Sequence, residues 1–198
     1  MVEGLLREID GAWSPLPTAR LTLRIIGSTA LFLQTDYRRG TKDSDVLETA
    51  ELSAALQGRL IALAGKGTLM HHRHGLYIEV VRSAFPFLAV EPVWRPVLGL
   101  SSGLRHLDIE VLDVLDVVVA KLARLHGSDR DDIAAMVDRG LVGHDALLSR
   151  FRSAVERIWH DARADDLPRF VRALHWVERD LLDEPQTCIE LPTWVAAE

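Results

Sequence analysis

The sequence contains a single cysteine, Cys188, and few aromatic residues, which make up 6% of its 198 positions. One cysteine cannot form an intramolecular disulfide, so the cytosol is the expected compartment. Long apolar runs are also missing, since none reaches the ~18 residues that a membrane-spanning helix needs. The first ten residues, MVEGLLREID, carry acids early and lack the basic-then-apolar layout of a secretion signal. We therefore expect a cytoplasmic protein with no membrane partner.

An excess of positive charge is absent, because 23 Lys and Arg residues face 29 Asp and Glu residues, for a net charge of −6. This balance disfavours a uniformly basic nucleic-acid binder, although it is compatible with a local basic patch. Lysine is rare, and Lys42, Lys66 and Lys121 are the three in the chain. The remaining composition, 48% hydrophobic and 26% charged, is that of an ordinary globular protein. A chain of this length can bury a core without disulfides or a structural metal.

Apolar periodicity predicts a small mixed α/β core followed by a C-terminal helical appendage. Alternation and β-branched composition predict strands at 21–26, 43–48, 76–81 and 106–112. Amphipathic patterns predict helices at 29–37, 50–64 (with Thr49 as cap), 113–126, 129–139, 145–164 and 168–182. Prolines make 84–103 an expected irregular connection, and the histidine-rich segment 70–74 is expected to be a solvated turn. The predicted division is a core at 1–140 and an appendage with a tail at 141–198.

Gly27 and Ser28 end the first predicted strand and precede a helix. Backbone N–H groups at a helix N-terminus attract phosphate, and glycine permits close approach of the backbone. The Ser28 hydroxyl can add a hydrogen bond. A Gly-Ser pair is also common in ordinary turns, so this pair alone does not decide between the two interpretations.

Asp43 and Asp45 lie two positions apart on the next predicted strand, so both side chains project from one face. Two such carboxylates repel each other unless a cation lies between them, and Mg²⁺ prefers one or two carboxylates plus phosphate oxygens. Taken alone, the pair could also be a polar strand end. The order of strand, Gly-Ser, helix, turn, paired aspartates and strand favours metal-assisted phosphoryl or nucleotidyl transfer.

The segment RIIGSTALFLQTDYRRGTKDSDVL resembles the nucleotidyltransferase fold signature. Its TKDSDVL part is similar to the AbiEii-type subgroup, the toxin components of toxin–antitoxin systems and their relatives. The resemblance covers about residues 20–140. It implies a minimal nucleotidyltransferase-like mixed sheet flanked by helices, an NTP substrate, and Mg²⁺ or Mn²⁺ as cofactor. It further implies an RNA (tRNA-like) or protein acceptor and an antitoxin partner, with Gly27, Ser28 and Thr41 binding the nucleotide.

The resemblance also implies a third metal-binding acid on the following strand, where LYIEVV offers Glu79. Tyr77 and Val81 share its face of that strand. Glutamate replaces the commoner aspartate here and lengthens the reach by one methylene. Alternatively, Glu79 is a solvent-facing residue of an edge strand, and the chain is a catalytically inactive nucleotide-binding or protein-interaction scaffold.

A later helix with a lysine, followed by two spaced aspartates, completes the resemblance in LDVVVAKLARLHGSDRDDI. Lys121 lies at the margin of that helix's apolar face, where it either extends towards a nucleotide phosphate or stays a solvated boundary lysine. Asp132 is expected to have a catalytic or positioning role. The alternative is that Asp129 and Asp132 are first-turn acids that complement the helix dipole.

Overall fold

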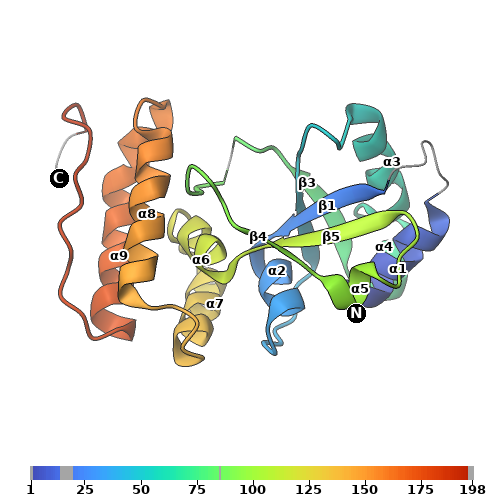
Figure 1. Cartoon of the computed structure of the whole chain (residues 1–198), viewed down its shortest axis with the longest axis horizontal. Helices are drawn as coiled ribbons and strands as arrows, with labels where there is room; N and C mark the ends of the chain where they lie inside the picture. The colour runs from blue at the N-terminus through green and yellow to red at the C-terminus, as the bar shows by residue number, and fades with distance from the viewer. Residues whose placement is uncertain (1, 14–19, 85, 196–198) are drawn as a thin grey trace. The chain divides into compact units, whose positions relative to one another are not determined.

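The computed structural model describes residues 2–13, 20–84 and 86–195 (Figure 1). The chain forms two compact units, each with its own internal packing. The first contains Met1–Pro86 and Trp94–Asp113, and the second contains Phe87–Val93 and Val114–Glu198. The division expected at residue 140 remains a prediction, and that position falls inside the second unit.

The first unit is built on a five-stranded mixed sheet with the strand order β3-β2-β1-β5-β4 (Figure 1). The strands are β1 (Leu21–Ile26), β2 (Asp43–Leu47), β3 (Tyr77–Val81), β4 (Trp94–Pro96) and β5 (Leu107–Leu112). β1 runs parallel to β5 and antiparallel to β2, while β2 runs parallel to β3. β4 adds to β5 in the antiparallel sense. The predicted class, a mixed α/β sheet flanked by helices, is confirmed.

Alternation along the strands separates a buried apolar face from a polar one. Leu23, Ile25, Val46, Ile78 and Ile109 are at most 2% exposed and form part of the core. The helices of this unit are α1 (Val2–Ala12), α2 (Gly27–Gln34), α3 (Ala54–Ala64), α4 (Leu69–His74) and α5 (Leu98–Ser101).

The buried side chain of Asp10 attaches α1 to the beginning of β5. Its carboxylate accepts hydrogen bonds from the backbone N–H groups of Arg105, His106 and Leu107, at 2.8–3.1 Å. A buried carboxylate is tolerated where several donors satisfy it. This contact fixes the N-terminal helix to the sheet.

The second unit is helical. It contains α6 (Val114–Leu122), α7 (Gly127–Asp138), α8 (His144–Ile158), the short 3₁₀ helix η1 (Ala162–Asp166) and α9 (Leu167–Leu181). α8 and α9 run side by side, and the chain that follows α9 turns back along it (Figure 1). The buried carboxylate of Glu178 holds that returning segment by accepting the N–H of Thr187 at 3.0 Å. None of the helices in the described residues has the length and apolar character needed to cross a membrane.

Two predictions for loop segments are wrong. Residues 70–74 belong to α4 and are not a turn, because the Thr68 side chain caps the helix at the His71 N–H and Gly75 ends it with a φ of +63°. The segment 84–103 is not wholly irregular, since it contains β4 and α5. Only three residues form β4, too few for alternation to be recognised in the sequence.

Some predicted helix boundaries also differ. α3 begins at Ala54 because Ser53, and not Thr49, is the N-cap that accepts the Leu56 N–H. α6 ends at Leu122, and Leu125 has a φ of +49°, a conformation that no helix continues through. The helix predicted from 145 stops at Ile158, and residues 162–166 form the separate η1.

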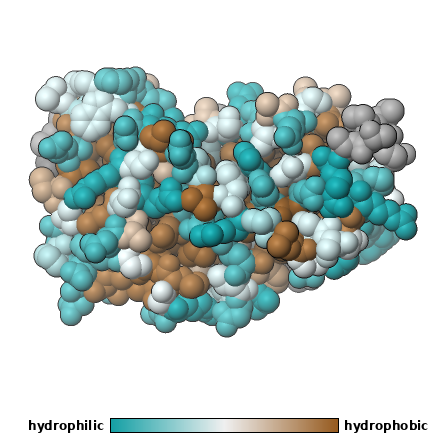
Figure 2. Space-filling view, viewed as in Figure 1, coloured by the Kyte–Doolittle hydropathy of each residue, from teal (hydrophilic) through white to brown (hydrophobic). Residues whose placement is uncertain are grey.

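Hydrophilic and apolar residues are interspersed over the face drawn in Figure 2. Two apolar side chains of the first unit are strongly exposed, Leu69 in α4 at 82% and Leu98 in α5 at 72%. α4 contains no buried residue at all. This helix therefore lies on the surface of the first unit and adds little to its core.

Candidate functional site

Three acidic residues, Asp43, Asp45 and Glu79, lie on the same face of the neighbouring strands β2 and β3. Ser44 and Val46 of β2 are buried, so Asp43 and Asp45, which alternate with them, project from the opposite face. In the parallel pairing of β2 with β3, Asp45 is the register partner of Glu79. Neighbouring strands are about 4.8 Å apart. The structure thus places the three predicted acids on one face of adjacent strands, while their roles in metal binding and catalysis remain predictions.

Gly27 brings the beginning of α2 against this acidic group. Ile26, the last residue of β1, is the antiparallel partner of Asp45. Gly27 has a φ of +68°, and a Cβ atom built there would lie 3.1 Å from Oδ2 of Asp45. A Cβ atom at this position would strain the backbone and require the Asp45 carboxylate to shift by a few tenths of an ångström.

The N-terminus of α2 is suited to an anion. Its N-cap residue is Ile26, whose side chain cannot accept a hydrogen bond from the first turn. Backbone N–H groups of a helix N-terminus that lack a side-chain cap can be satisfied by a phosphate. Gly27 and Ser28, predicted to bind nucleotide, occupy this first turn beside Asp45.

Two threonine hydroxyls hold Asp43 in place. The carbonyl oxygen of Asp43 accepts hydrogen bonds from Thr29 Oγ1 at 3.1 Å and Thr41 Oγ1 at 3.0 Å, and Thr41 Oγ1 also lies 3.1 Å from Asp43 Oδ1. Thr41, predicted as a nucleotide-binding residue, therefore contacts the acid itself. Thr29 was not predicted. It directly follows Gly27-Ser28 in the sequence, and its burial in the first turn of α2 is visible only in the structure.

The electrostatics of the site are reflected in Tyr77, the register partner of Asp43 on β3. Burial raises the pKa of the Tyr77 phenol, and the charges of Asp43, Glu79 and Asp45 raise it further. All three carboxylates therefore act on the same small region. Such a concentration of negative charge favours a bound cation.

The acidic residues of the site can hold Mg²⁺ only together with oxygens from a substrate. In the part of the chain that the structure describes, no three His, Cys, Asp or Glu side chains are grouped closely enough to hold a metal ion by themselves. Mg²⁺, however, is commonly bound by one or two carboxylates together with substrate phosphate oxygens. Asp43 and Asp45, beside a helix N-terminus suited to phosphate, fit that mode of binding.

Lys121, Asp129 and Asp132 form a buried cluster in the second unit. Lys121 Nζ lies 2.8 Å from a carboxylate oxygen of each aspartate, and the lysine side chain is 3% exposed. Arg124 Nη2 lies 3.1 Å from Asp129. Lys121 is therefore not a solvated boundary lysine, which was the alternative to its predicted phosphate contact, because two carboxylates from α7 enclose its ammonium group. Its predicted contact with phosphate, and the catalytic or positioning role of Asp132, remain predictions.

Burial and the neighbouring cations have opposite effects on the pKa of Asp129. Burial acts to raise the pKa of Asp129, but the hydrogen bond and charge of Lys121, together with Arg124 and the His126 N–H, hold it below its usual value. The aspartate is consequently ionised within the protein, and the cluster is an ion pair rather than a neutral hydrogen-bonded group.

Comparison with protein families decides the broader identity. A family model described as a nucleotidyltransferase of unknown function (DUF6036) matches residues 6–178. The chain belongs to this nucleotidyltransferase family. Neither the comparison with curated proteins nor that with solved structures found a match. The more specific AbiEii-type assignment remains a prediction.

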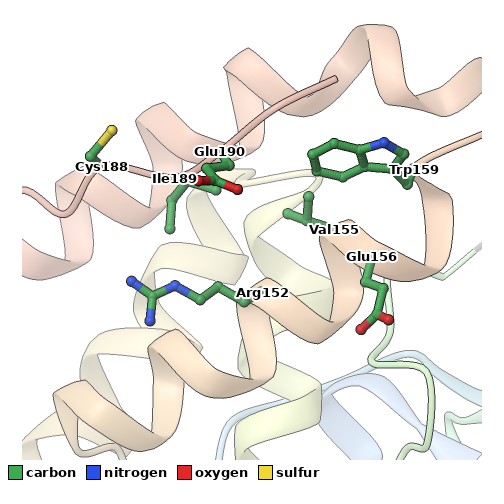
Figure 3. A pocket seen from close by; sticks show the side chains of 7 residues that line it. All are labelled: Arg152, Val155, Glu156, Trp159, Cys188, Ile189 and Glu190. Carbon is green, nitrogen blue, oxygen red and sulfur yellow. The ribbon is translucent and has the colours of Figure 1, made fainter. Parts of the chain in front are cut away.

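This nucleotidyltransferase-family chain also has a cavity of about 420 Å³ in its second unit, between α8 and the segment after α9 (Figure 3). Val155 of α8 and Trp159, the residue that follows this helix, face Ile189 and Glu190, whereas the sulfur of Cys188 points away from the other lining side chains. None of the predicted site residues lines this cavity. It is therefore distinct from the acidic group on the sheet.

Proposed function

We propose that this chain is a metal-dependent nucleotidyltransferase that transfers a nucleoside monophosphate from an NTP to an acceptor hydroxyl. The observation that supports it best is the position of Gly27, at the N-terminus of α2, directly against the carboxylate of Asp45. Support comes from a helix N-terminus, which can bind phosphate, beside two carboxylates, which can bind a metal, in a chain whose family is described as nucleotidyltransferases.

In this proposal each group has a defined task. Asp43 and Asp45 hold Mg²⁺ or Mn²⁺, which supplies charge stabilisation on the phosphates when bound. Gly27, Ser28 and Thr41 bind the β- and γ-phosphates. Glu79 accepts the acceptor's proton as the acceptor oxygen bonds to the α-phosphorus. The bond between the α-phosphorus and the bridging oxygen breaks, and pyrophosphate leaves.

By resemblance to the AbiEii-type subgroup, the acceptor is an RNA, for example a tRNA-like end, or a protein side chain. The same resemblance suggests the toxin part of a toxin–antitoxin pair, with NTP and an antitoxin protein as partners. One observation favours the alternative of a catalytically inactive nucleotide-binding or interaction scaffold: in the described residues, the acids are not grouped closely enough to hold a metal without a substrate.

The test replaces both aspartates in the variant Asp43→Asn/Asp45→Asn. Since the change is nearly isosteric and relieves like-charge repulsion, we expect an unchanged or higher melting temperature. Transfer of label from α-labelled NTPs to total cellular RNA and protein should fall about a thousand-fold or more, because bound metal contributes several kcal/mol. Ribonuclease and protease digestion of the labelled product identifies the acceptor class.

The matched control is Asp138→Asn/Asp165→Asn, which makes the same charge change at exposed positions of the second unit. It should transfer label as well as the wild type does. Full activity in the Asp43/Asp45 variant would show that these aspartates are not the centre of the reaction. Absence of metal-dependent transfer in the wild type with every NTP would favour the scaffold alternative.

A further inference from the structure

An aromatic and basic cluster adjoins the three carboxylates within the first unit. Tyr77 opens β3 and is the register partner of Asp43. The ring of His71, from α4, lies 5.2 Å from the Tyr77 ring, nearly perpendicular to it at 80°. Lys66 Nζ lies 5.9 Å from the centroid of the same ring. These three residues converge from the edge strand, a surface helix and the loop that precedes it.

The imidazole of His71 is held in one orientation. Its Nδ1 accepts the Gly67 N–H at 2.9 Å, so the neutral ring carries its proton on Nε2. The backbone N–H of His71 is bound by the Thr68 hydroxyl. Gly67 has a φ of +87°, which lets the loop turn beneath the ring. The sequence of this loop thus positions a histidine ring against Tyr77.

Polar contacts rather than a buried apolar face hold α4 in place, since Arg73 and His74 both contact the Glu8 carboxylate of α1. α4 buries none of its side chains, and Leu69 at its beginning is 82% exposed. A six-residue helix without a buried face gains little stability from the core. Lys66 is exposed on a flexible four-carbon stem, while Tyr77 remains partly accessible. Two rings and a lysine are therefore presented at the surface beside the acids.

We propose that Lys66, His71 and Tyr77 bind one nucleotide, with the two rings contacting its base and the Lys66 ammonium group its phosphate. Aromatic rings with a nearby cation are the usual means of binding a nucleotide without base-specific hydrogen bonds. The inference rests on the proposed function, because the pairing of Tyr77 with Asp43 places this nucleotide beside the reacting groups. Its source is either the NTP or the terminal nucleotide of an RNA acceptor.

Binding measurements on the full chain distinguish these sources. One arm measures binding of each of the four NTPs with Mg²⁺ by calorimetry. The other follows fluorescein-labelled RNA decamers, rA10 and rU10, by fluorescence anisotropy. The variants are Tyr77→Leu, which removes the ring, Tyr77→Phe, which keeps it, and Lys66→Ala. The control is Arg82→Ala, an exposed arginine five residues further along the chain, roughly 16 Å from Tyr77.

Loss of the ring in Tyr77→Leu should weaken binding of one probe class about ten-fold, because stacking on one aromatic residue contributes this much or more. Tyr77→Phe should stay within about two-fold of the wild type, and Lys66→Ala should weaken the same probe about five-fold. Arg82→Ala should have no effect. An effect on NTPs identifies the NTP as the source, and an effect on the decamers identifies the RNA acceptor.

The proposal is overturned if Lys66→Ala and the folded Tyr77→Leu variant both bind both probe classes as the wild type does. It is also overturned if the wild type binds neither class. Should Tyr77→Leu fail to fold, Lys66→Ala against Arg82→Ala decides the question, since both residues are exposed. The proposed function has a separate readout, the transfer of label from NTPs. Binding that depends on the Tyr77 ring, without any label transfer, would support the nucleotide site at Lys66, His71 and Tyr77 and reject the transferase activity.

Discussion

The positive φ of Gly27 allows α2 to begin close to the carboxylate of Asp45. The φ of +68° lies in the left-handed region, which only glycine enters without cost. The space where a Cβ would lie is bounded by Asp45 Oδ2 at 3.1 Å. Glycine thus allows the helix N-terminus to begin beside the acids, and a larger residue must move one or the other.

Gly27→Ala should lower the free energy of unfolding by about 1–2 kcal/mol, since alanine is disfavoured in the left-handed region. It should also weaken binding of Mg²⁺ with NTP, because the Asp45 carboxylate has to shift. Urea unfolding and calorimetric titration measure the two effects. The matched control is Gly58→Ala in the middle of α3, where no atom lies within 4 Å of the new Cβ.

In contrast to Gly27→Ala, the Gly58→Ala variant should have a free energy of unfolding about 0.5–1 kcal/mol higher than the wild type. It should bind Mg²⁺ with NTP as the wild type does. A Gly27→Ala protein that matches the wild type in both measurements would contradict the role assigned to this backbone angle.

Among the elements, those with clear periodicity were predictable from the sequence. The predicted strand at 21–26 coincides with β1, and the predictions for β2, β3 and β5 differ by one residue at one end. β4 was missed because it has three residues and contains Pro96, which an edge strand tolerates. α4 was missed because a helix with no buried face has no apolar periodicity, and only Thr68 and Gly75 mark its ends.

The buried cluster of Lys121, Asp129 and Asp132 links α6 to α7. Lys121 is near the end of α6, and both aspartates lie in the first half of α7, so the ion pairs close the turn between the two helices. Removing one partner from a buried pair leaves an uncompensated charge, which is strongly destabilising. The turn between these helices is therefore held by electrostatic contacts that depend on the ionisation of the aspartates.

Asp129→Asn should reduce the free energy of unfolding at pH 7 by about 3–5 kcal/mol. Asp129 has a pKa below its usual value, so its contribution is present above the unfolded pKa of about 3.9 and is lost as the pH falls through the lower folded pKa. The variant should therefore lose stability less steeply than the wild type below about pH 4.

Urea unfolding between pH 7 and pH 2.5 tests this expectation. Asp138→Asn, an exposed change on the same helix, serves as control and should follow the wild-type curve within about 0.5 kcal/mol. Parallel curves for the wild type and Asp129→Asn in acid would show that Asp129 is not held ionised by Lys121.

For the molecule as a whole, the candidate site was predictable only where it is local in sequence. Gly27, Ser28, Asp43 and Asp45 fall within nineteen consecutive positions, and strand alternation together with the family resemblance pointed to Glu79, which the register of β3 places on their face. The convergence of Lys66 and His71 on Tyr77 depends on how α4 folds back against β3, which no spacing reveals. The burial of Lys121 was missed because its partners come from the following helix.

The overall charge of −6 makes a further prediction about RNA. An acidic protein repels a polyanion, so RNA can bind only where a local cation such as Lys66 meets a phosphate. Each phosphate neutralised on a single strand contributes about −0.7 to the slope of log K against log salt. With one or two such contacts, binding of the rA10 and rU10 decamers should show a slope of roughly −1.

Anisotropy titrations between about 50 and 300 mM KCl, a range over which a slope of about −1 lowers the affinity about six-fold, measure this slope. Lys66→Ala should make it shallower by about 0.7, whereas Tyr77→Leu should weaken binding without changing the slope, because an aromatic ring releases no counterions. A wild-type slope steeper than about −4 would mean that an extended basic surface binds the RNA, and that the cluster around Tyr77 is not its principal contact.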